Sequence, residues 1–117
     1  MKPLMEPLCD IDALIDGHIA AYNSKDLAAF VATLDPEAQI YEHPGKPQLK
    51  GTEAITAHYR QLFAKLPTLT VVVKHRTRLE NHVVDEESMA LNGEQIAGDV
   101  AVYRVESCLI TRVDTIE

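Results

Sequence analysis

The sequence has few basic residues and no long apolar run. Its 11 Lys and Arg residues are outnumbered by 18 Asp and Glu residues, which gives a formal net charge of -7. Nucleic acids and anionic membranes are bound by clustered basic side chains, and only the set Lys74, Arg76 and Arg78 approaches a cluster. No segment reaches the roughly 20 apolar residues that a membrane-spanning helix needs. The composition therefore argues against nucleic acid or membrane as a partner.

Cysteine is also scarce. Cys9 and Cys108 are the only 2 cysteines, and no Cys-x-x-Cys pair is present. Two separate thiols are more typical of a reducing compartment than of a disulfide scaffold. The opening MKPLMEPLCD contains prolines and acidic residues, unlike a signal peptide. We therefore expect free thiols and a cytoplasmic location.

The usual patterns of metal and cofactor sites are missing as well. No pair among the 5 histidines has the His-x-His or His-x-x-x-His spacing of a metal site. There is no glycine-rich loop to hold phosphates and no serine in a nucleophile elbow. We expect neither a metal nor a cofactor.

Helical and strand patterns follow one another along the 117 residues, a length that suits one domain over residues 1–117. Apolar side chains recur at helical spacing in residues 10–22, with His18 in the middle of the apolar stripe. A second helix, capped by Asn23 or Ser24, is predicted from near Asp26 to Asp35-Pro36. A third begins at Thr52, its expected cap, and ends at Pro67.

Strand patterns dominate the rest of the chain. Residues 38–43 form a short strand closed by Pro44-Gly45 and Pro47. Asn92-Gly93 is a hairpin signal, because both residues tolerate positive φ. The other strands are predicted at 69–80, 83–91, 94–106 and 108–116. These patterns predict an α+β fold, with three helices packed on one strongly curved, mostly antiparallel sheet.

The order of elements, the run LIDGHIAAYNSKDLAAFVATLDPEAQIYEHP and the segment YEHPGKPQLKG resemble the nuclear transport factor 2-like superfamily. Within it, the chain is similar to the ketosteroid isomerase and SnoaL-like polyketide cyclase branch, from about Ile11 to Ile116. The resemblance implies a cone-shaped fold whose sheet wraps around an apolar pocket for a small hydrophobic molecule. It also implies a homodimer formed through the outer face of the sheet. The fold hosts isomerases, dehydratases, cyclases and non-catalytic modules, so function must be argued from the site.

The resemblance places His43 where the isomerase branch has an acidic general base. An imidazole has an ordinary pKa of about 6.5, so it can act as base or acid near neutrality. Strand alternation puts Gln39, Tyr41 and His43 on one face. If that face points inward, His43 lies at the pocket and Tyr41 contacts the ligand. In the alternative, His43 is a strand-end histidine that hydrogen-bonds the following turn.

Other positions complete or weaken the resemblance to an isomerase site. His18 matches a tyrosine that donates to the substrate oxyanion, but its pattern also fits a core histidine with satisfied ring nitrogens. Tyr22, one turn later, is either a second donor or a core aromatic. Ala101 stands where the branch has an oxyanion-hole acid, which argues against a standard ketosteroid isomerase. Asp99 and Tyr103 share its side-chain direction and are candidate ligand contacts.

Three further candidate ligand contacts are Tyr59, Phe63 and Arg112. Tyr59 and Phe63 belong to the apolar stripe of the third helix. Arg112 and Asp114 share a face of the last strand, and either they point inward as an ion pair or they lie on the surface. Two functions remain open. The first is a cofactor-free acid–base enzyme using His43, His18 and Tyr22, in which replacing His43 abolishes turnover. The second is a non-catalytic ligand-binding or dimerisation module.

Overall fold

The structure is a computed structural model that describes residues 9–117, and it consists of 3 helices and one 6-stranded sheet. The helices are α1 (Ile11–Ser24), α2 (Leu27–Ala32) and α3 (Thr52–Lys65). The strands are β1 (Leu34–Glu42), β2 (Lys46–Lys50), β3 (Thr70–Leu79), β4 (His82–Leu91), β5 (Glu94–Glu106) and β6 (Leu109–Ile116). The strand order is β2-β1-β6-β5-β4-β3, and only β1 and β6 are parallel. The predicted α+β class is confirmed.

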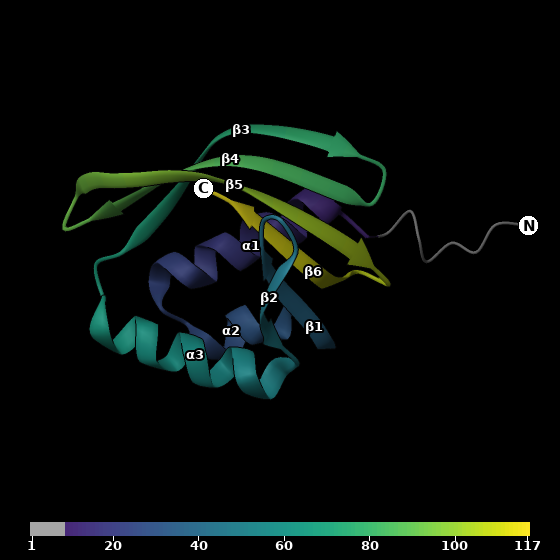
Figure 1. Cartoon of the computed structure of the whole chain (residues 1–117), viewed down its shortest axis with the longest axis horizontal. Coiled ribbons are helices and arrows are strands. Elements are labelled where there is room, and N and C mark those ends of the chain that lie inside the picture. The colour runs from purple at the N-terminus through teal and green to yellow at the C-terminus, as the bar shows by residue number, and fades with distance from the viewer. Residues whose placement is uncertain (1–8) are drawn as a thin grey trace, which may run out of the picture.

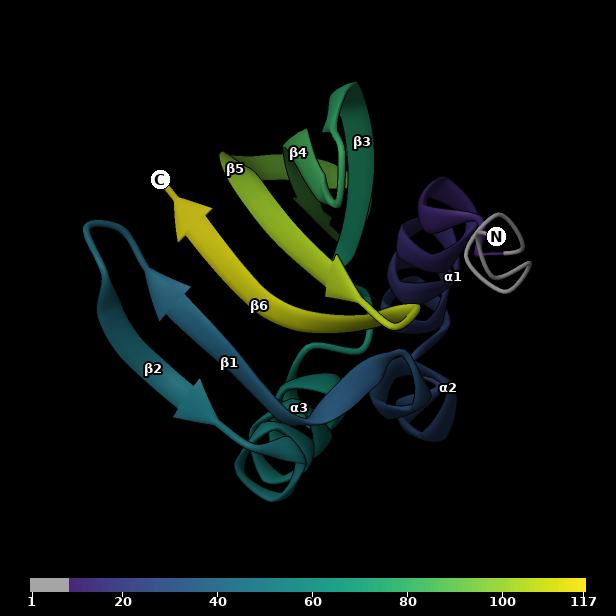
Figure 2. The ribbon, with the colours of Figure 1, turned by 90° about the vertical axis from the view of Figure 1, so that its right-hand side faces the viewer.

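The sheet is curled but does not close into a barrel, as the view along it shows (Figure 2). The three helices all lie on one side of it, with α1 beneath the long strands β3, β4 and β5 (Figure 1). The buried core fills the space between the two layers. Its fully buried members Ile15, Ile55, Val83 and Ile110 come from α1, α3, β4 and β6. The sheet and the helices thus share one core.

Aspartates fix where the first two helices begin. The carboxylates of Asp10 and Asp26 accept hydrogen bonds from the backbone N–H groups of Ala13 and Ala29, at 3.0 and 3.1 Å. Each bond satisfies an amide that has no partner inside its helix. The predicted caps of α2, Asn23 and Ser24, are therefore wrong. The Asn23 side chain instead bonds the backbone of Val71, which ties the end of α1 to the start of β3.

Strand β2 lies where only turns had been predicted. Pro44, Gly45 and Pro47 predict a turn there, because proline lacks the N–H that a strand with neighbours on both sides needs. However, β2 is the edge strand of the sheet and pairs only with β1. At an edge, one row of backbone groups faces solvent, so proline is tolerated. The element order is consequently ααββαββββ and not ααβαββββ.

An irregularity in β3 changes which of its side chains point inward. The pairing with β4 shifts between Val73 and His75, so strict alternation is interrupted there. Beyond the shift, Arg76 pairs opposite Asp85 and bonds it on the helix-covered side of the sheet. Arg78 reaches Asp12 of α1 at 3.4 Å. Arg76 is therefore turned toward the helices, whereas Arg78 and Asp12 are 39% and 50% exposed and pair at the surface.

The two cysteines form a disulfide bond, which corrects the prediction of free thiols. Cys9 precedes α1 and Cys108 lies in the turn between β5 and β6, and they are joined although 99 positions apart in sequence. Two cysteines this far apart give no local spacing signal, because only the fold brings them together. The argument from cysteine usage for a reducing compartment no longer holds. Among the described residues, no helix is long and apolar enough to cross a membrane.

Candidate functional site

A cavity of about 340 Å³ lies between the helices and the inner face of the sheet. Most of its wall is apolar or aromatic, and its exposed members His58 and Glu117 mark the rim. Its principal lining residues come from α1, α2, α3 and the inward positions of β1, β4, β5 and β6: His18, Ile19, Tyr22, Phe30, Ile40, Tyr59, Leu62, Glu87, Met89, Asp99, Ala101, Tyr103, Val113 and Thr115. The size and the mostly apolar lining are those of a small-molecule site.

Aromatic rings form the helical side of the cavity. The rings of Phe30 and Tyr59 lie 4.6 Å apart between centroids, and Tyr22 is 6.3 Å from Tyr59 in an edge-on arrangement. These separations are the ones that aromatic pairs prefer, so the rings support one another. Burial raises the pKa of Tyr22 to about 12, and the negative charges of Glu87 and Asp99 add to that rise. Tyr22 therefore keeps its hydroxyl proton at neutral pH.

His18 is buried in the apolar stripe of α1, and its hydrogen bonds define its tautomer. Its Nδ1 lies 2.7 Å from the Thr33 hydroxyl, while that hydroxyl donates to the backbone carbonyl of Phe30 at 2.7 Å. Because the Thr33 hydrogen is already used, Thr33 must accept from Nδ1–H. Burial lowers the pKa of His18 to about 4, so the ring is neutral near pH 7. Its Nε2 is therefore left without a proton, as an acceptor, and His18 is among the residues that line the cavity.

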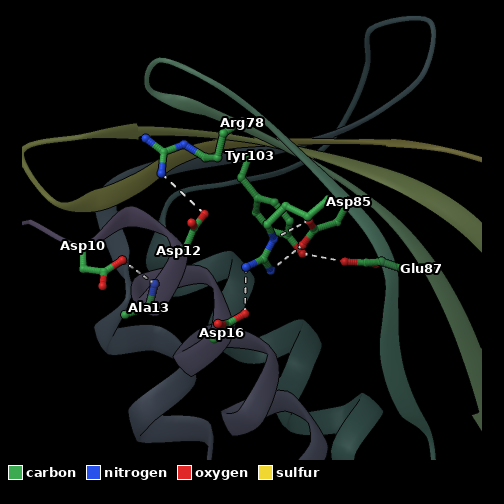
Figure 3. Close-up of polar contacts among 9 residues, drawn as sticks. Asp10, Asp12, Ala13, Asp16, Arg78, Asp85, Glu87 and Tyr103 are labelled. Carbon is green, nitrogen blue, oxygen red and sulfur yellow. Dashed lines mark hydrogen bonds and ion pairs between the residues drawn. The ribbon is translucent and has the colours of Figure 1, made fainter.

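Two carboxyl groups lie side by side on the sheet side of the cavity. Glu87 of β4 pairs directly opposite Asp99 of β5, and both line the cavity. The Tyr103 hydroxyl donates to Glu87 Oε2 at 3.0 Å, as Figure 3 shows. Among the described residues, Asp99 Oδ1 is the one buried side-chain oxygen or nitrogen that has no hydrogen-bond partner. The protein thus provides a hydrogen bond to Glu87 and leaves Asp99 Oδ1 without one.

Burial and mutual repulsion favour the protonated form of this pair. Burial raises the pKa of Glu87 to about 7; the negative charge of Asp99 adds to this rise, and the hydrogen bond from Tyr103 opposes it. The pKa of Asp99 is raised as well, chiefly by burial. Two carboxylates this close cannot both be ionised cheaply. Near neutral pH the pair consequently holds a proton that it can give up or take back.

Neither member of the pair has a cationic partner. The neighbouring Asp85, which is fully buried, is paired with Arg76 at 2.6 Å, and Arg76 also bonds Asp16 of α1 at 2.8 Å (Figure 3). Within residues 9–117, no Lys, Arg or His forms an ion pair with Glu87 or Asp99. No three His, Cys, Asp or Glu side chains in that range are grouped as a metal site. The described residues thus leave this carboxyl pair without a neutralising cation, and strongly perturbed carboxyls in a cavity are typical of functional sites.

The structure brings together some of the residues that the sequence singled out. His18, Tyr22, Tyr59, Asp99 and Tyr103 all line the cavity. Ala101 lines it too, directly opposite Asp85 in the strand pairing, and contributes no polar group. Asp99 and Tyr103 line the cavity on the same face of β5 as Ala101, as the strand alternation predicts.

Four other candidates lie outside the cavity lining, namely Phe63, His43, Tyr41 and Arg112. Phe63 is buried in the core against the rings of Tyr22 and Tyr59. His43 is exposed at the end of β1. Tyr41 was expected to point inward with His43, but its neighbour Ile40 is the residue that lines the cavity, and His43 lies in the turn after β1. The expected position of His43 at the pocket is thus corrected, because inward and outward differ by a single residue on a strand.

Tyr41 and Arg112 meet on the outer face of the sheet. The Arg112 guanidinium stacks on the Tyr41 ring at 3.8 Å and makes two hydrogen bonds to Asp114, at 2.8 and 2.9 Å. Val113 and Thr115, on either side of Asp114, are the residues of β6 that line the cavity. Of the two orientations left open by the sequence, Arg112 and Asp114 adopt the outward one.

Glu87 is the site residue that sequence reasoning missed. The alternation Val83, Asp85, Glu87, Met89 puts two acids among apolar side chains, which is a signal for a buried polar site. Its pairing with Asp99 depends on a register shift between Met89 and Ala90. Counting back from the Asn92-Gly93 hairpin without that shift places Gly98 opposite Glu87. The sequence does not mark the shift.

Comparisons with known proteins agree with the geometry. Residues 15–113 match the model of the SnoaL-like domain, whereas no curated protein matches the chain. An uncharacterised cystatin-fold protein from Novosphingobium aromaticivorans superposes with a TM-score of 0.84 at 22% identity, covering 92% of this chain and 98% of that one. A candidate polyketide cyclase from Sinorhizobium meliloti superposes with a TM-score of 0.75 at 12% identity, covering 88% of this chain and 93% of that one.

A third structure has a ketosteroid isomerase-like fold, comes from Catenulispora acidiphila and was solved in complex with trimethylamine. It has a TM-score of 0.71 and 18% identity, covering 87% of this chain and 82% of that one. These likenesses to solved structures establish the fold, which is the nuclear transport factor 2-like one. With the match over residues 15–113, they show that the chain belongs to the SnoaL-like domain family.

Proposed function

We propose that the protein is a cofactor-free acid–base enzyme of the isomerase, cyclase or dehydratase type. Its substrate is a small, largely apolar molecule with a carbonyl group, held in the cavity between the helices and the sheet. The observation that carries this proposal is the carboxyl pair Glu87–Asp99, which lines an apolar cavity without a cationic partner. A carboxyl group with a pKa near 7 is matched to proton transfer at neutral pH.

The ionised member of the pair takes a proton from the carbon next to the substrate carbonyl. The electron pair of that C–H bond moves into the carbonyl and forms an enolate, whose oxygen needs a hydrogen-bond donor. Tyr22 and Tyr59 keep their hydroxyl protons, since burial raises the pKa of both phenols. In this proposal the two tyrosine hydroxyls donate hydrogen bonds to the enolate oxygen and so form its oxyanion hole.

The same proton then completes one of three reactions. Returned to a different carbon, it gives an isomer of the substrate. If the enolate carbon attacks a second carbonyl, the proton goes to the new alkoxide and a ring is closed. If a hydroxyl group leaves next to the enolate carbon, the proton goes to it and water is released. In each case the carboxyl pair ends in its starting protonation state, and no oxidant or reductant is consumed.

His18 has a different part from the one that the sequence suggested. Its Nδ1–H is committed to Thr33, so the ring cannot donate to an oxyanion through that nitrogen. The free Nε2 accepts a hydrogen bond from the substrate and so positions it. His43 has no part in this proposal because it does not line the cavity.

A second candidate function is a binding module without turnover. It is favoured by Ala101, which supplies no hydrogen-bond donor at a position where the isomerase branch has one. The complex of the Catenulispora acidiphila relative with trimethylamine supports small-molecule binding in this fold.

Proton exchange into deuterated water separates the two candidates. A panel of small cyclic ketones and 1,3-diketones is incubated with the protein in D₂O, and loss of the protons next to the carbonyl is followed by NMR. We expect exchange above the buffer rate for at least one compound. Glu87→Gln and Asp99→Asn should reduce it by about 10²-fold or more, the usual contribution of a positioned acid–base group.

Two further variants act as controls in the same assay. Glu86→Gln removes an exposed carboxyl one residue away on the opposite face of β4, and His43→Ala removes the imidazole that the sequence favoured. Both should keep the wild-type rate. Exchange at the buffer rate for every compound, or a rate unchanged in Glu87→Gln, contradicts the enzyme proposal.

A further inference from the structure

We propose that the ligand of this cavity carries an ammonium group, so that the site selects small organic cations over neutral molecules of the same shape. This inference deepens the proposed function and rests on it in one respect, that the same cavity is the substrate site. It follows from three independent features of the cavity wall: its charge, its unsatisfied hydrogen-bond acceptors and its aromatic rings.

The charged side chains of the wall are all acidic. Glu87 and Asp99 line the cavity and Glu117 lies at its rim, whereas no Lys or Arg is among the lining residues. The nearby cations are engaged elsewhere. Arg76 is bonded to Asp85 and Asp16, and the Lys25 ammonium donates to the backbone carbonyls of Tyr22 and Leu69. A bound cation would therefore meet negative charge that the protein has not neutralised.

The unsatisfied polar atoms of the wall are acceptors. Asp99 Oδ1 is buried without a hydrogen-bond partner. His18 Nε2 carries a lone pair, because the ring proton is on Nδ1 and is bound to Thr33. An ionised carboxylate and a neutral imidazole nitrogen can accept but cannot donate. An ammonium N–H is a donor without acceptor capacity, so it complements both atoms.

Aromatic residues line the same cavity as the acids. Tyr22, Phe30, Tyr59 and Tyr103 all line the cavity, and Phe30 lies 4.6 Å from Tyr59 between ring centroids. The face of an aromatic ring attracts a cation within about 6 Å of its centre, by roughly 0.5–2 kcal/mol depending on how far the cation is desolvated. Neutral apolar ligands also pack on rings. The combination of rings with uncompensated carboxylates distinguishes the two kinds of ligand.

Cation binding and proton binding compete at this site. A bound ammonium stabilises the ionised carboxylates, so it lowers the pKa of the pair and releases a proton. Since the pKa of free Glu87 is raised to about 7, affinity should rise with pH up to somewhat above 7 and then level off. The titratable and charged groups that face the pair are His18 and Tyr22 of α1, His58 and Tyr59 of α3, Asp85 of β4, Tyr103 of β5 and Glu117 after β6.

Isothermal titration calorimetry with matched probes tests the inference. Choline and 3,3-dimethylbutan-1-ol have the same shape, but choline has a positive nitrogen where the alcohol has a carbon. Cyclohexylamine and cyclohexanol form a second pair, in which the cation has N–H donors. We expect at least one cation to bind about ten-fold or more tightly than its neutral counterpart at pH 8, and to release protons on binding at pH 6.5.

Variants of the full chain show where the preference arises. Asp99→Asn and Glu87→Gln should each reduce it, while Glu86→Gln, which removes an exposed charge from the opposite face of β4, should leave it intact. If one of the two cavity variants fails to fold, the remaining variant and the two probe pairs still test the ammonium preference. Equal affinity for cation and neutral probe, no binding by either in both pairs, or a preference that survives both cavity variants overturns the inference.

The outcome is distinguishable from failure of the enzyme proposal. Ammonium selectivity without proton exchange would keep this inference and favour the binding module. Exchange of neutral ketones without ammonium selectivity would keep the enzyme and overturn this inference.

Discussion

Glu87 and Asp99 face each other across neighbouring antiparallel strands and line the same cavity, and no Lys, Arg or His of residues 9–117 forms an ion pair with either one. Burial raises the pKa of both carboxyls. In a cavity whose wall is mostly apolar or aromatic, such a pair is costly to keep fully ionised. Protonation of one carboxyl, or binding of a positively charged ligand, would relieve that cost.

The pair makes folding stability depend on pH in a predictable direction. The pKa of Glu87 is raised from 4.5 to about 7 in the folded protein, so the folded state binds the proton more tightly than the unfolded chain. Its contribution is fully present below about pH 4.5 and is lost as pH rises through about 7. In urea unfolding, the free energy of unfolding of the wild type should fall by up to about 3 kcal/mol relative to that of Glu87→Gln as pH rises across this window. A difference that stays constant with pH would contradict the raised pKa.

His18 provides a spectroscopic test of the hydrogen-bond pattern. Because Thr33 donates to the Phe30 carbonyl and accepts from the ring, the neutral imidazole should carry its proton on Nδ1. Long-range ¹H–¹⁵N NMR distinguishes the two tautomers directly. With its pKa lowered to about 4 by burial, the ring should remain neutral from pH 5 to 8. A proton on Nε2, or titration of the ring near pH 6.5, would refute this account of His18.

Arg76 should be far more important for stability than Arg78. Removing Arg76 leaves the carboxylate of Asp85, which has 0% exposure, without its counter-ion, and the loss of one partner of a buried pair costs about 3–5 kcal/mol. Arg78 and Asp12 are 39% and 50% exposed, and such surface pairs contribute at most about 1 kcal/mol. Denaturant unfolding of Arg76→Ala and Arg78→Ala compares them. Equal losses of stability would mean that the buried network is unimportant.

The disulfide bond makes a chemical prediction. Cys9 and Cys108 enclose nearly the whole chain, with a sequence separation of 99. In the chain-entropy model, a loop of that length restricts the unfolded state by roughly 4–5 kcal/mol. Thiol titration of the unfolded, unreduced protein should therefore find no reactive cysteine, and a reductant should lower Tm. Two titratable thiols in protein folded under oxidising conditions would show that the bond does not form.

Local patterns in the sequence were enough to predict the fold. The apolar stripe around Ile15 marked α1, and Asn92-Gly93 marked the β4–β5 hairpin. Both signals depend on neighbouring residues alone, and tertiary packing agreed with them. The proline-rich strand β2 was missed because its tolerance for Pro47 depends on its position at the sheet edge. The disulfide was missed for a similar reason, since Cys9 and Cys108 become neighbours only in three dimensions.

The site was harder to predict because it depends on strand faces and register. Alternation predicts that Tyr41 and His43 share a face, but it does not predict that Ile40 is the residue that points inward. The shift after Val73 turned Arg76 inward, and the shift at Met89 set Glu87 opposite Asp99. Each of these outcomes depends on a displacement by one residue, which reverses or moves every later side chain. The resemblance implied that His43 lies at the pocket, whereas the structure leaves it exposed and outside the cavity lining.

The most direct test of the central claim is an NMR titration of the Glu87 side-chain carboxyl in ¹³C-labelled protein. The account predicts a midpoint near pH 7, and a lower midpoint in Asp99→Asn, where the repelling charge is gone. Glu86, one residue away on the outer face, serves as an internal reference in the same spectra. A Glu87 midpoint near 4.5, the ordinary value for a glutamate, that does not change in Asp99→Asn would contradict the carboxyl pair as a proton-exchanging site.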